Sequence, residues 1–273
     1  MRKICVSDAT LVSQKQNKTP LSFREKIETA RQLDKLGVDV IELPAIEDVN
    51  TDVLLIKTVS SFVTRGTISV PVALDASDLG TVADALAKAK KSRLRLCVPA
   101  SYVKMEYSCH KKPGKILEIV PEKVKLCREK CDEVELFVED ATRADREFLA
   151  SLISAAVEAG ATVVTVSDDE GATMADDFGA FVAELKKDIP ELAKARMGAY
   201  CSNAFGLSLS SLLAAIKAGA DEITLCASGN ACAAVEEFAA IVSAKGEKLG
   251  WKTGLLYTEL KRICAQIAWT TDT

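Results

Sequence analysis

Eight short runs rich in β-branched residues recur along this chain of 273 residues, and longer amphipathic runs lie between them. Strands that alternate with helical patterns of about 10–15 residues are typical of βαβ units and a parallel sheet. Eight such units predict that the sheet closes into a barrel. We therefore predict an α/β fold, a (β/α)8 TIM barrel that forms a single domain over residues 1–273. The predicted strands are Ile4–Ser7, Val38–Glu42, Ser69–Leu74, Arg95–Val98, Glu133–Val138, Thr162–Ser167, Arg196–Tyr200 and Glu222–Leu225.

Helix boundaries carry their own signals. Ser22 followed by Glu25 is a capping box, and it predicts a helix that ends at Gly37. The segments KLGVD, EAGAT and KAGAD repeat one arrangement, in which Gly37, Gly160 or Gly219 lies between a helix and the next strand. Glycine takes the left-handed conformation that ends a helix at little steric cost, so each segment predicts a helix-to-strand turn.

Two more helical patterns follow the eighth strand, Val235–Lys245 and Tyr257–Ala268. The second has no predicted strand before it, so we expect an extra helix that packs on the outside of the barrel. The sequence shows no linker and no low-complexity segment.

Composition excludes several classes of function. The net charge of -4 and the pI of about 5.4, without a basic stripe, argue against nucleic-acid binding. We find no secretory signal and no apolar run of the ~20 residues that span a bilayer, so we expect no membrane partner. The nine cysteines are scattered and the single histidine leaves no Cys/His zinc pattern. We therefore expect free, mostly buried thiols and a cytoplasmic location.

Functional side chains of such a barrel gather at the C-terminal ends of its strands. Acidic, basic and phenolic residues there are the candidate catalytic groups, namely Glu42, Glu139, Asp140, Arg143 and Tyr200. Smaller polar residues at the same ends are the candidate substrate-binding groups, namely Asp8, Ser13, Gln14, Ser101, Thr142, Ser167, Ser202 and Asn203.

Seven segments match, in order and spacing, the motifs of one known family. SDATL resembles its opening D-T-T-L, and GVDVIEL resembles its second strand, with Glu42 at the family's glutamate. VELFVEDATRADREFL resembles E-D-A-T-R, and VSDDEGATMADDF resembles D-T-x-G-x-x-x-P. The others are YVKMEYSCHKKPGKILE, NAFGLSLSSLLAAIKAGADEI and TGLLYTEL. Over essentially its whole length, the chain resembles the DRE-TIM metallolyases, which include 2-isopropylmalate synthase, homocitrate synthase and HMG-CoA lyase.

The resemblance implies a metal site that this chain departs from. The family has Arg-Asp after D-T-T-L, where this chain has Val12 and Ser13. The family's His-x-His in the seventh strand is replaced by Tyr200 and Ser202. Divalent metals prefer carboxylate and imidazole ligands, and neutral hydroxyls are poor replacements. We therefore predict no metal site and no cofactor; a divalent metal (Mg, Mn or Zn) is expected only if these positions are misread.

Three hypotheses about function follow from the resemblance and its departures. The first is a degenerate synthase-like barrel that binds a small carboxylic acid or a partner protein. The second is an active lyase or acyltransferase on small 2-keto or hydroxy acids that uses metal-free residues. The third is an active synthase-like enzyme with an unorthodox metal set.

Individual residues keep structural alternatives beside the functional ones. Glu42 could bond a neighbouring backbone group or Lys15, and Glu139, Asp140 and Arg143 could form an internal ion-pair network. The less favoured chemical alternatives are a Schiff base on Lys15 or Lys104, a nucleophile at Cys201 or Cys226, and a general base at His110.

The family's barrels pair into dimers, so the resemblance also implies a homodimer. We expect the apolar C-terminal end, with Trp251 and Trp269, to supply the contact. The chain has no room for the C-terminal regulatory domain of isopropylmalate synthases, so we expect no feedback control through such a domain.

Overall fold

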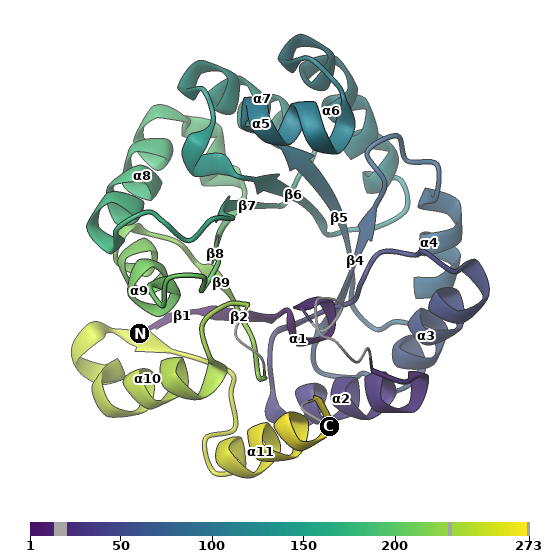
Figure 1. Ribbon diagram of the computed structural model, residues 1–273, viewed down its shortest axis with the longest axis vertical. Coiled ribbons are helices and arrows are strands. Elements are labelled where there is room, and N and C mark those ends of the chain that lie inside the picture. Colours follow the sequence, from purple (N-terminus) through teal and green to yellow (C-terminus); the bar gives the residue numbers. More distant parts are fainter. Residues whose placement is uncertain (14–20, 229–230, 272–273) are drawn as a thin grey trace. The chain divides into compact units, whose positions relative to one another are not determined.

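The computed structural model describes residues 1–13, 21–228 and 231–271. Eight parallel strands form a closed barrel in the order β2-β3-β4-β5-β6-β7-β8-β9, with helices outside the ring (Figure 1). The predicted (β/α)8 barrel is therefore confirmed. The barrel strands are β2 Cys5–Asp8, β3 Val40–Glu42, β4 Thr67–Val72, β5 Ser92–Pro99, β6 Val134–Glu139, β7 Val163–Asp168, β8 Arg196–Cys201 and β9 Glu222–Leu225.

The helices follow the strands as the sequence predicts. Each of the three predicted turn glycines has a positive φ: 85° at Gly37, 114° at Gly160 and 111° at Gly219. The α-helices are α1 Thr10–Ser13, α2 Phe23–Leu36, α3 Val49–Phe62, α4 Leu79–Leu86, α5 Tyr102–Lys104, α6 Pro113–Arg128, α7 Arg146–Glu158, α8 Ala175–Asp188, α9 Ser208–Ala218, α10 Val235–Leu249 and α11 Leu260–Thr271. A π-helical turn, Met105–Cys109, follows α5, and two 3-10 turns are Ala141–Arg143 and Pro190–Lys194.

Residue contacts divide the chain into two compact units, which we describe separately. Unit 1 comprises residues 1–70, 80–92 and 223–273. Unit 2 comprises residues 71–79 and 93–222.

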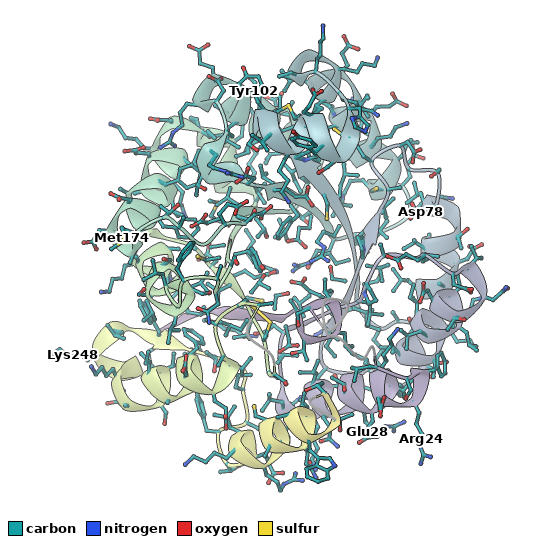
Figure 2. All side chains as sticks on the ribbon, viewed as in Figure 1. Arg24, Glu28, Asp78, Tyr102, Met174 and Lys248 are labelled. Atoms are coloured by element: carbon teal, nitrogen blue, oxygen red, sulfur yellow. A yellow bond between two sulfur atoms is a disulfide. The ribbon has the colours of Figure 1, made fainter. Side chains whose placement is uncertain are left out.

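Helix α2 shows how unit 1 is built from local signals. The Ser22 side chain accepts a hydrogen bond from the Glu25 N–H and the Glu25 carboxylate accepts one from the Ser22 N–H, which confirms the predicted capping box. One face of the helix is buried and packs against α3 and α11. Arg24 and Glu28 lie exposed on the other side (Figure 2). This helical periodicity of apolar residues is what made α2 predictable.

The C-terminal part of unit 1 departs from the prediction. Two short strands, β1 Arg2–Lys3 and β10 Trp251–Lys252, pair in parallel, so a strand does precede the last helix. Trp251 is only 6% exposed, whereas Trp269 is 78% exposed. Trp251 therefore belongs to the packed interior, and the proposal of a contact surface that contains it is wrong for that residue.

Unit 2 contains four neighbouring strands, β5 to β8, and their helices. The register runs without interruption from Leu94↔Val134 to Pro99↔Glu139 between β5 and β6. Helices α8 and α9 pack closely against each other. Gly179 permits this approach, since a Cβ atom at that position would lie 3.1 Å from the Cβ of Ala214.

A buried ion network lies at the first residues of the unit 2 strands. Arg93 in β5 is 1% exposed at its side chain and contacts three glutamates. Its Nη2 donates to Glu222 Oε2 at 2.9 Å, its Nη1 to Glu135 Oε2 at 3.3 Å, and its Nε to Glu133 Oε1 at 2.6 Å. Arg196 Nη1 also donates to Glu222 Oε2, at 2.9 Å. These charges therefore stabilise the end of the strands opposite to the predicted site.

Candidate functional site

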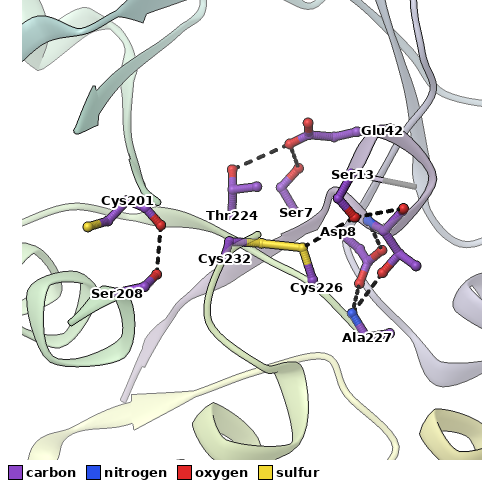
Figure 3. Close-up of a disulfide and its surroundings, with 11 residues drawn as sticks. Ser7, Asp8, Ser13, Glu42, Cys201, Ser208, Thr224, Cys226, Ala227 and Cys232 are labelled. Carbon is purple, nitrogen blue, oxygen red and sulfur yellow. Dashed lines mark hydrogen bonds between the residues drawn. A yellow bond between two sulfur atoms is a disulfide. The ribbon is translucent and has the colours of Figure 1, made fainter. Parts of the chain in front are cut away.

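Asp8, at the end of β2, connects two segments of unit 1 (Figure 3). Its Oδ1 accepts a hydrogen bond from the Thr10 N–H at 2.9 Å, and its Oδ2 accepts one from the Ala227 N–H at 2.9 Å. Burial raises the pKa of Asp8 to about 7, against the lowering effect of these hydrogen bonds. The Asp8 carboxyl thus holds the start of α1 to the chain after β9.

Glu42 lies at the end of β3, also in unit 1, and its carboxylate is buried. Its Oε1 accepts hydrogen bonds from Ser7 Oγ at 2.7 Å and from Thr224 Oγ1 at 3.3 Å (Figure 3). The suggested bond to Lys15 lies outside the described residues. The Glu42 carboxylate thus contacts hydroxyls of two other strands, β2 and β9, which the sequence analysis did not single out.

The expectation that all cysteines are free thiols is wrong at one place. Cys226, directly after β9, forms a disulfide with Cys232. The Cys226 sulfur lies 4.0 Å from Ser13 Oγ, and Ser13 Oγ donates to the Thr10 carbonyl at 2.9 Å (Figure 3). A sulfur in a disulfide carries no thiol, so Cys226 is not a nucleophile in this state.

Asp140 organises the polar residues at the end of β6 in unit 2. It has a left-handed backbone, with φ of 57°, and its side chain is buried. Its carboxylate accepts hydrogen bonds from Ser101 Oγ and, at 2.7 Å, from Arg143 Nη2. Its N–H donates to Ser167 Oγ at 2.9 Å, and Arg143 Nη2 also reaches Glu170 Oε1 at 3.1 Å. These contacts support the ion-network interpretation of Asp140 and Arg143.

Asp168, at the end of β7, fixes the next loop of unit 2. Its Oδ2 accepts from the Thr173 N–H at 2.9 Å, and its Oδ1 accepts from Thr142 Oγ1 at 3.4 Å. Gly171 follows with φ of 64°, and a Cβ there would lie 2.2 Å from the Ser202 carbonyl oxygen. Only glycine fits this close approach of two backbones, so the loop brings the ends of β7 and β8 together.

Glu139 is a candidate carboxyl group of unit 2 that takes no part in the Asp140–Arg143–Glu170 ion pairs. It forms no ion pair and no side-chain hydrogen bond with any residue in 1–13, 21–228 or 231–271. Burial raises the pKa of Glu139, and the charge of Lys104 partly offsets this. Lys104 Nζ itself pairs with Asp169 Oδ2 at 2.9 Å. A carboxyl with a raised pKa beside a cation is a candidate for proton transfer.

Lys104 is held in its charged form. Burial opposes the charge, but the hydrogen bond and charge of Asp169 outweigh it and raise the pKa of Lys104. A Schiff-base lysine must be neutral, so the structure does not favour that role for Lys104. Burial likewise raises the pKa of the Cys201 thiol to about 12, which disfavours a thiolate nucleophile.

The residues at the end of β8 contact their own unit. The Tyr200 ring lies 5.9 Å from the Phe137 ring, measured between centroids. The Ser202 N–H donates to the Asp168 carbonyl at 2.9 Å, and Asn203 Oδ1 accepts from the Ser208 N–H at 3.4 Å. The polar stretch that replaces His-x-His thus packs within the fold of unit 2.

The predicted candidates separate into two groups. Unit 1 holds three of them, Asp8, Ser13 and Glu42, and unit 2 holds Ser101, Glu139, Asp140, Thr142, Arg143, Ser167, Tyr200, Ser202 and Asn203. Gln14 lies outside the described residues. His110 is exposed and has φ of 51°. Contacts that were not predicted involve Ser7, Thr224, Asp168 and Asp169, of which Ser7, Asp168 and Asp169 lie in the quoted segments SDATL and VSDDEGATMADDF.

Within the described ranges, no three or more His, Cys, Asp or Glu side chains are grouped so that they could hold a metal ion. In the same part of the chain, no helix combines the length and apolarity that crossing a bilayer requires.

Comparison with known proteins assigns the family. The family model described as HMGL-like matches residues 3–267. The chain belongs to the HMGL-like family. The resemblance of the motifs to the DRE-TIM metallolyases is thereby confirmed. Among curated HMGL-like relatives, 2-isopropylmalate synthase of Halalkalibacterium halodurans is 30% identical over 273 residues, which are 98% of this chain and 53% of that protein. 2-Isopropylmalate synthase 1 of Caldanaerobacter subterraneus subsp. tengcongensis is 32% identical over 232 residues, covering 84% of this chain and 58% of that protein. The chain thus spans about half the length of the curated relatives it matches.

Solved structures support the fold of this HMGL-like chain. HMG-CoA lyase from Acinetobacter baumannii, in complex with coenzyme A and 3-methylmalate, superposes with a TM-score of 0.77 at 16% identity, covering 98% of this chain and 91% of that one. HMG-CoA lyase from Pseudomonas aeruginosa has a TM-score of 0.75 at 16% identity, covering 97% of this chain and 92% of that one.

Proposed function

We propose that this HMGL-like barrel binds a small carboxylic acid without a catalytic divalent metal. The observation that supports this most strongly is the identity of three side chains. Ser13, Tyr200 and Ser202 stand where the resemblance implies an aspartate and two histidines.

These side chains do not fit the metal. All three offer neutral hydroxyls, whereas hard and borderline divalent cations prefer carboxylate oxygen and imidazole nitrogen. Ser13 Oγ is already used as a donor to the Thr10 carbonyl, at 2.9 Å. The function proposed for this chain therefore involves no metal-dependent chemical step.

Unit 2 supplies the cations for an acid. Arg143 and Lys104 follow neighbouring strands β6 and β5, and their side chains are 45% and 33% exposed. Arg143 Nη2 reaches Glu170, whose side chain is 55% exposed. A ligand carboxylate that takes the place of Glu170 would form a charge-assisted hydrogen bond with Arg143. Protonated Glu139 would donate a further one.

Names of the relatives suggest the class of acid. The curated relatives are 2-isopropylmalate synthases, and one superposed HMG-CoA lyase holds 3-methylmalate. For this chain we propose small branched hydroxy or keto acids.

Calorimetric titration of chelator-treated protein tests this proposal. We expect no heat of binding with Mn²⁺ or Zn²⁺, and one-to-one binding of 2-isopropylmalate or 3-methylmalate. Arg143→Ala should weaken acid binding about 10-fold or more, because a hydrogen bond to a charged group contributes about 1.5–3 kcal/mol. Arg146→Ala is the matched control, since Arg146 pairs with Glu184 on the exposed surface of unit 2. Tight one-to-one metal binding, or no binding of either acid, would refute the proposal.

A second candidate function is a metal-free lyase or acyltransferase, which the isolated carboxyl of Glu139 favours. As a general acid or base, Glu139 would contribute about 10²–10⁴-fold to the rate. An assay with acetyl-CoA and small 2-keto acids in excess chelator should then show turnover that Glu139→Gln lowers at least 100-fold. The control variant is Glu158→Gln, at the exposed end of α7. If turnover is absent, or equal in both variants, the catalytic proposal fails and the binding proposal stands alone.

The homodimer and the cytoplasmic location stay predictions.

A further inference from the structure

A covalent bond joins Cys226 and Cys232 in unit 1, and the residue after Cys226 contacts Asp8. Cys226 and Cys232 are separated by 6 positions, and their Cα atoms are 5.9 Å apart (Figure 3). That separation lies within the range in which a disulfide forms without movement of the backbone. Each of the two residues is 1% exposed.

The pair differs from every other cysteine of the chain. The chain has nine cysteines, and the other seven form no disulfide: Cys5, Cys97, Cys109, Cys127, Cys131, Cys201 and Cys264. Chains that depend on disulfides for their fold usually pair their cysteines completely, and the barrel has a large core of its own. A single disulfide beside seven cysteines that form none points instead to a pair that exchanges between oxidation states.

The free thiols near the core are poorly suited to such exchange. Burial raises the pKa of Cys127 to about 11 and the pKa of Cys264 to about 12. A buried, protonated thiol reacts slowly, because the thiolate is the reactive species. Cys127 and Cys264 are therefore not expected to exchange in the same series of buffers.

Backbone contacts connect the disulfide to the candidate site. The Cys226 N–H donates to the Ala233 carbonyl at 3.0 Å, and the Cys226 carbonyl accepts from the Val235 N–H at 3.0 Å. The next N–H, that of Ala227, is shared between Asp8 Oδ2 at 2.9 Å and Thr10 Oγ1 at 2.8 Å. The disulfide thus lies one residue away from the Ala227 N–H that the Asp8 carboxylate binds.

Helix α1 completes this arrangement. Ser13 Oγ is 4.0 Å from the Cys226 sulfur, and the same turn carries Thr10. Opening of the disulfide therefore removes a constraint directly beside Ser13, the position that resembles a metal-binding aspartate.

We infer that Cys226 and Cys232 are a reversible thiol–disulfide modification site. The oxidation state of this pair controls how firmly the backbone from Asp8 to Ser13 is held in place. A dithiol reductant donates two electrons and two protons, the sulfur–sulfur bond breaks, two thiols form, and the reductant becomes a cyclic disulfide. A disulfide oxidant such as oxidised glutathione reverses the step. This inference goes beyond the proposed function and needs no ligand.

Redox titration of the purified chain tests the inference. The protein is equilibrated in buffers of graded reduced to oxidised glutathione ratio, quenched in acid, alkylated in denaturant and mapped as peptides by mass spectrometry. We expect the pair to pass from zero to two alkylations within the series. Because both residues are buried, equilibration should require local opening and be slow. Cys109→Ser is the control, since Cys109 lies in unit 2 and should leave the titration unchanged.

Hydrogen–deuterium exchange on the same samples reads the effect on the site. The Ala227 amide and the amides of Thr10–Ser13 should exchange at least 10-fold faster in the reduced protein than in the oxidised protein. Cys232→Ser should exchange like the reduced protein in every buffer. If that variant does not fold, the two states of the unaltered chain still decide the question.

Three results would overturn the inference. The pair could stay reduced in the most oxidising buffer, or stay oxidised in excess dithiothreitol. It could also titrate while both states exchange at the same rate, in which case the disulfide controls nothing at the site. None of these results depends on acid binding, so failure here and failure of the proposed function are distinguishable.

Discussion

Replacement of Arg93 with methionine lowers the free energy of unfolding by about 3–5 kcal/mol, because it removes the buried guanidinium that three glutamates contact. Glu222 and Glu135 are 3% and 4% exposed at their side chains, so water cannot replace the guanidinium. Methionine has a similar length and helps to keep a cavity from adding to the loss. Urea unfolding followed by circular dichroism measures the change.

A matched surface variant separates burial from charge. Lys115→Met removes the cation of the Lys115–Glu118 pair, whose side chains are 61% and 68% exposed, so the loss should be below about 1 kcal/mol. Equal losses in the two variants would show that burial does not determine how much the Arg93 network contributes to the free energy of unfolding.

Acid weakens the same network within a defined pH range. Burial alone would raise the pKa of Glu222, but attraction and hydrogen bonds from Arg93 and Arg196 outweigh it and lower that pKa from 4.5 to about 2. A lowered carboxyl pKa means that the stabilisation is complete above about pH 4.5 and is lost as the pH falls through 2. At about 1.4 kcal/mol per pH unit, the loss is on the order of 3 kcal/mol.

Urea titrations at a series of pH values between 5 and 2 measure this dependence. Glu222→Gln should flatten the curve over that range, because its amide cannot take up a proton, and it should be less stable than the parent at neutral pH. An unchanged slope in Glu222→Gln would assign the acid sensitivity to other carboxyls.

The barrel was predictable because its signals are local. Alternation of strand and helix patterns located all eight barrel strands, and the turn glycines at Gly37, Gly160 and Gly219 located three helix ends. Strands β1 and β10 escaped prediction because two residues carry no periodic pattern. Their pairing depends on a contact between the first residues and Trp251–Lys252.

The site was predictable in position but not in pairing. Strand ends identified Asp140 and Arg143, and the structure joins them. By contrast, Arg93 contacts Glu222 across 129 positions, and Cys226 pairs with Cys232 at a spacing that matches no cysteine motif. The Arg93–Glu222 contact depends on how distant strands align in the closed sheet, which single-sequence patterns do not encode.

The division of the chain into two units also has a consequence for biosynthesis. Unit 1 is assembled from residues 1–70, 80–92 and 223–273, whereas unit 2 is almost one continuous stretch. Contacts between residues far apart in sequence form late and slow folding. During synthesis, unit 2 can pack before β9 has been made, whereas β2 and β3 belong to unit 1 and need β9 to complete it. Strands β2 and β3 are then completed after the later unit 2, and their apolar surface needs protection from aggregation during that interval.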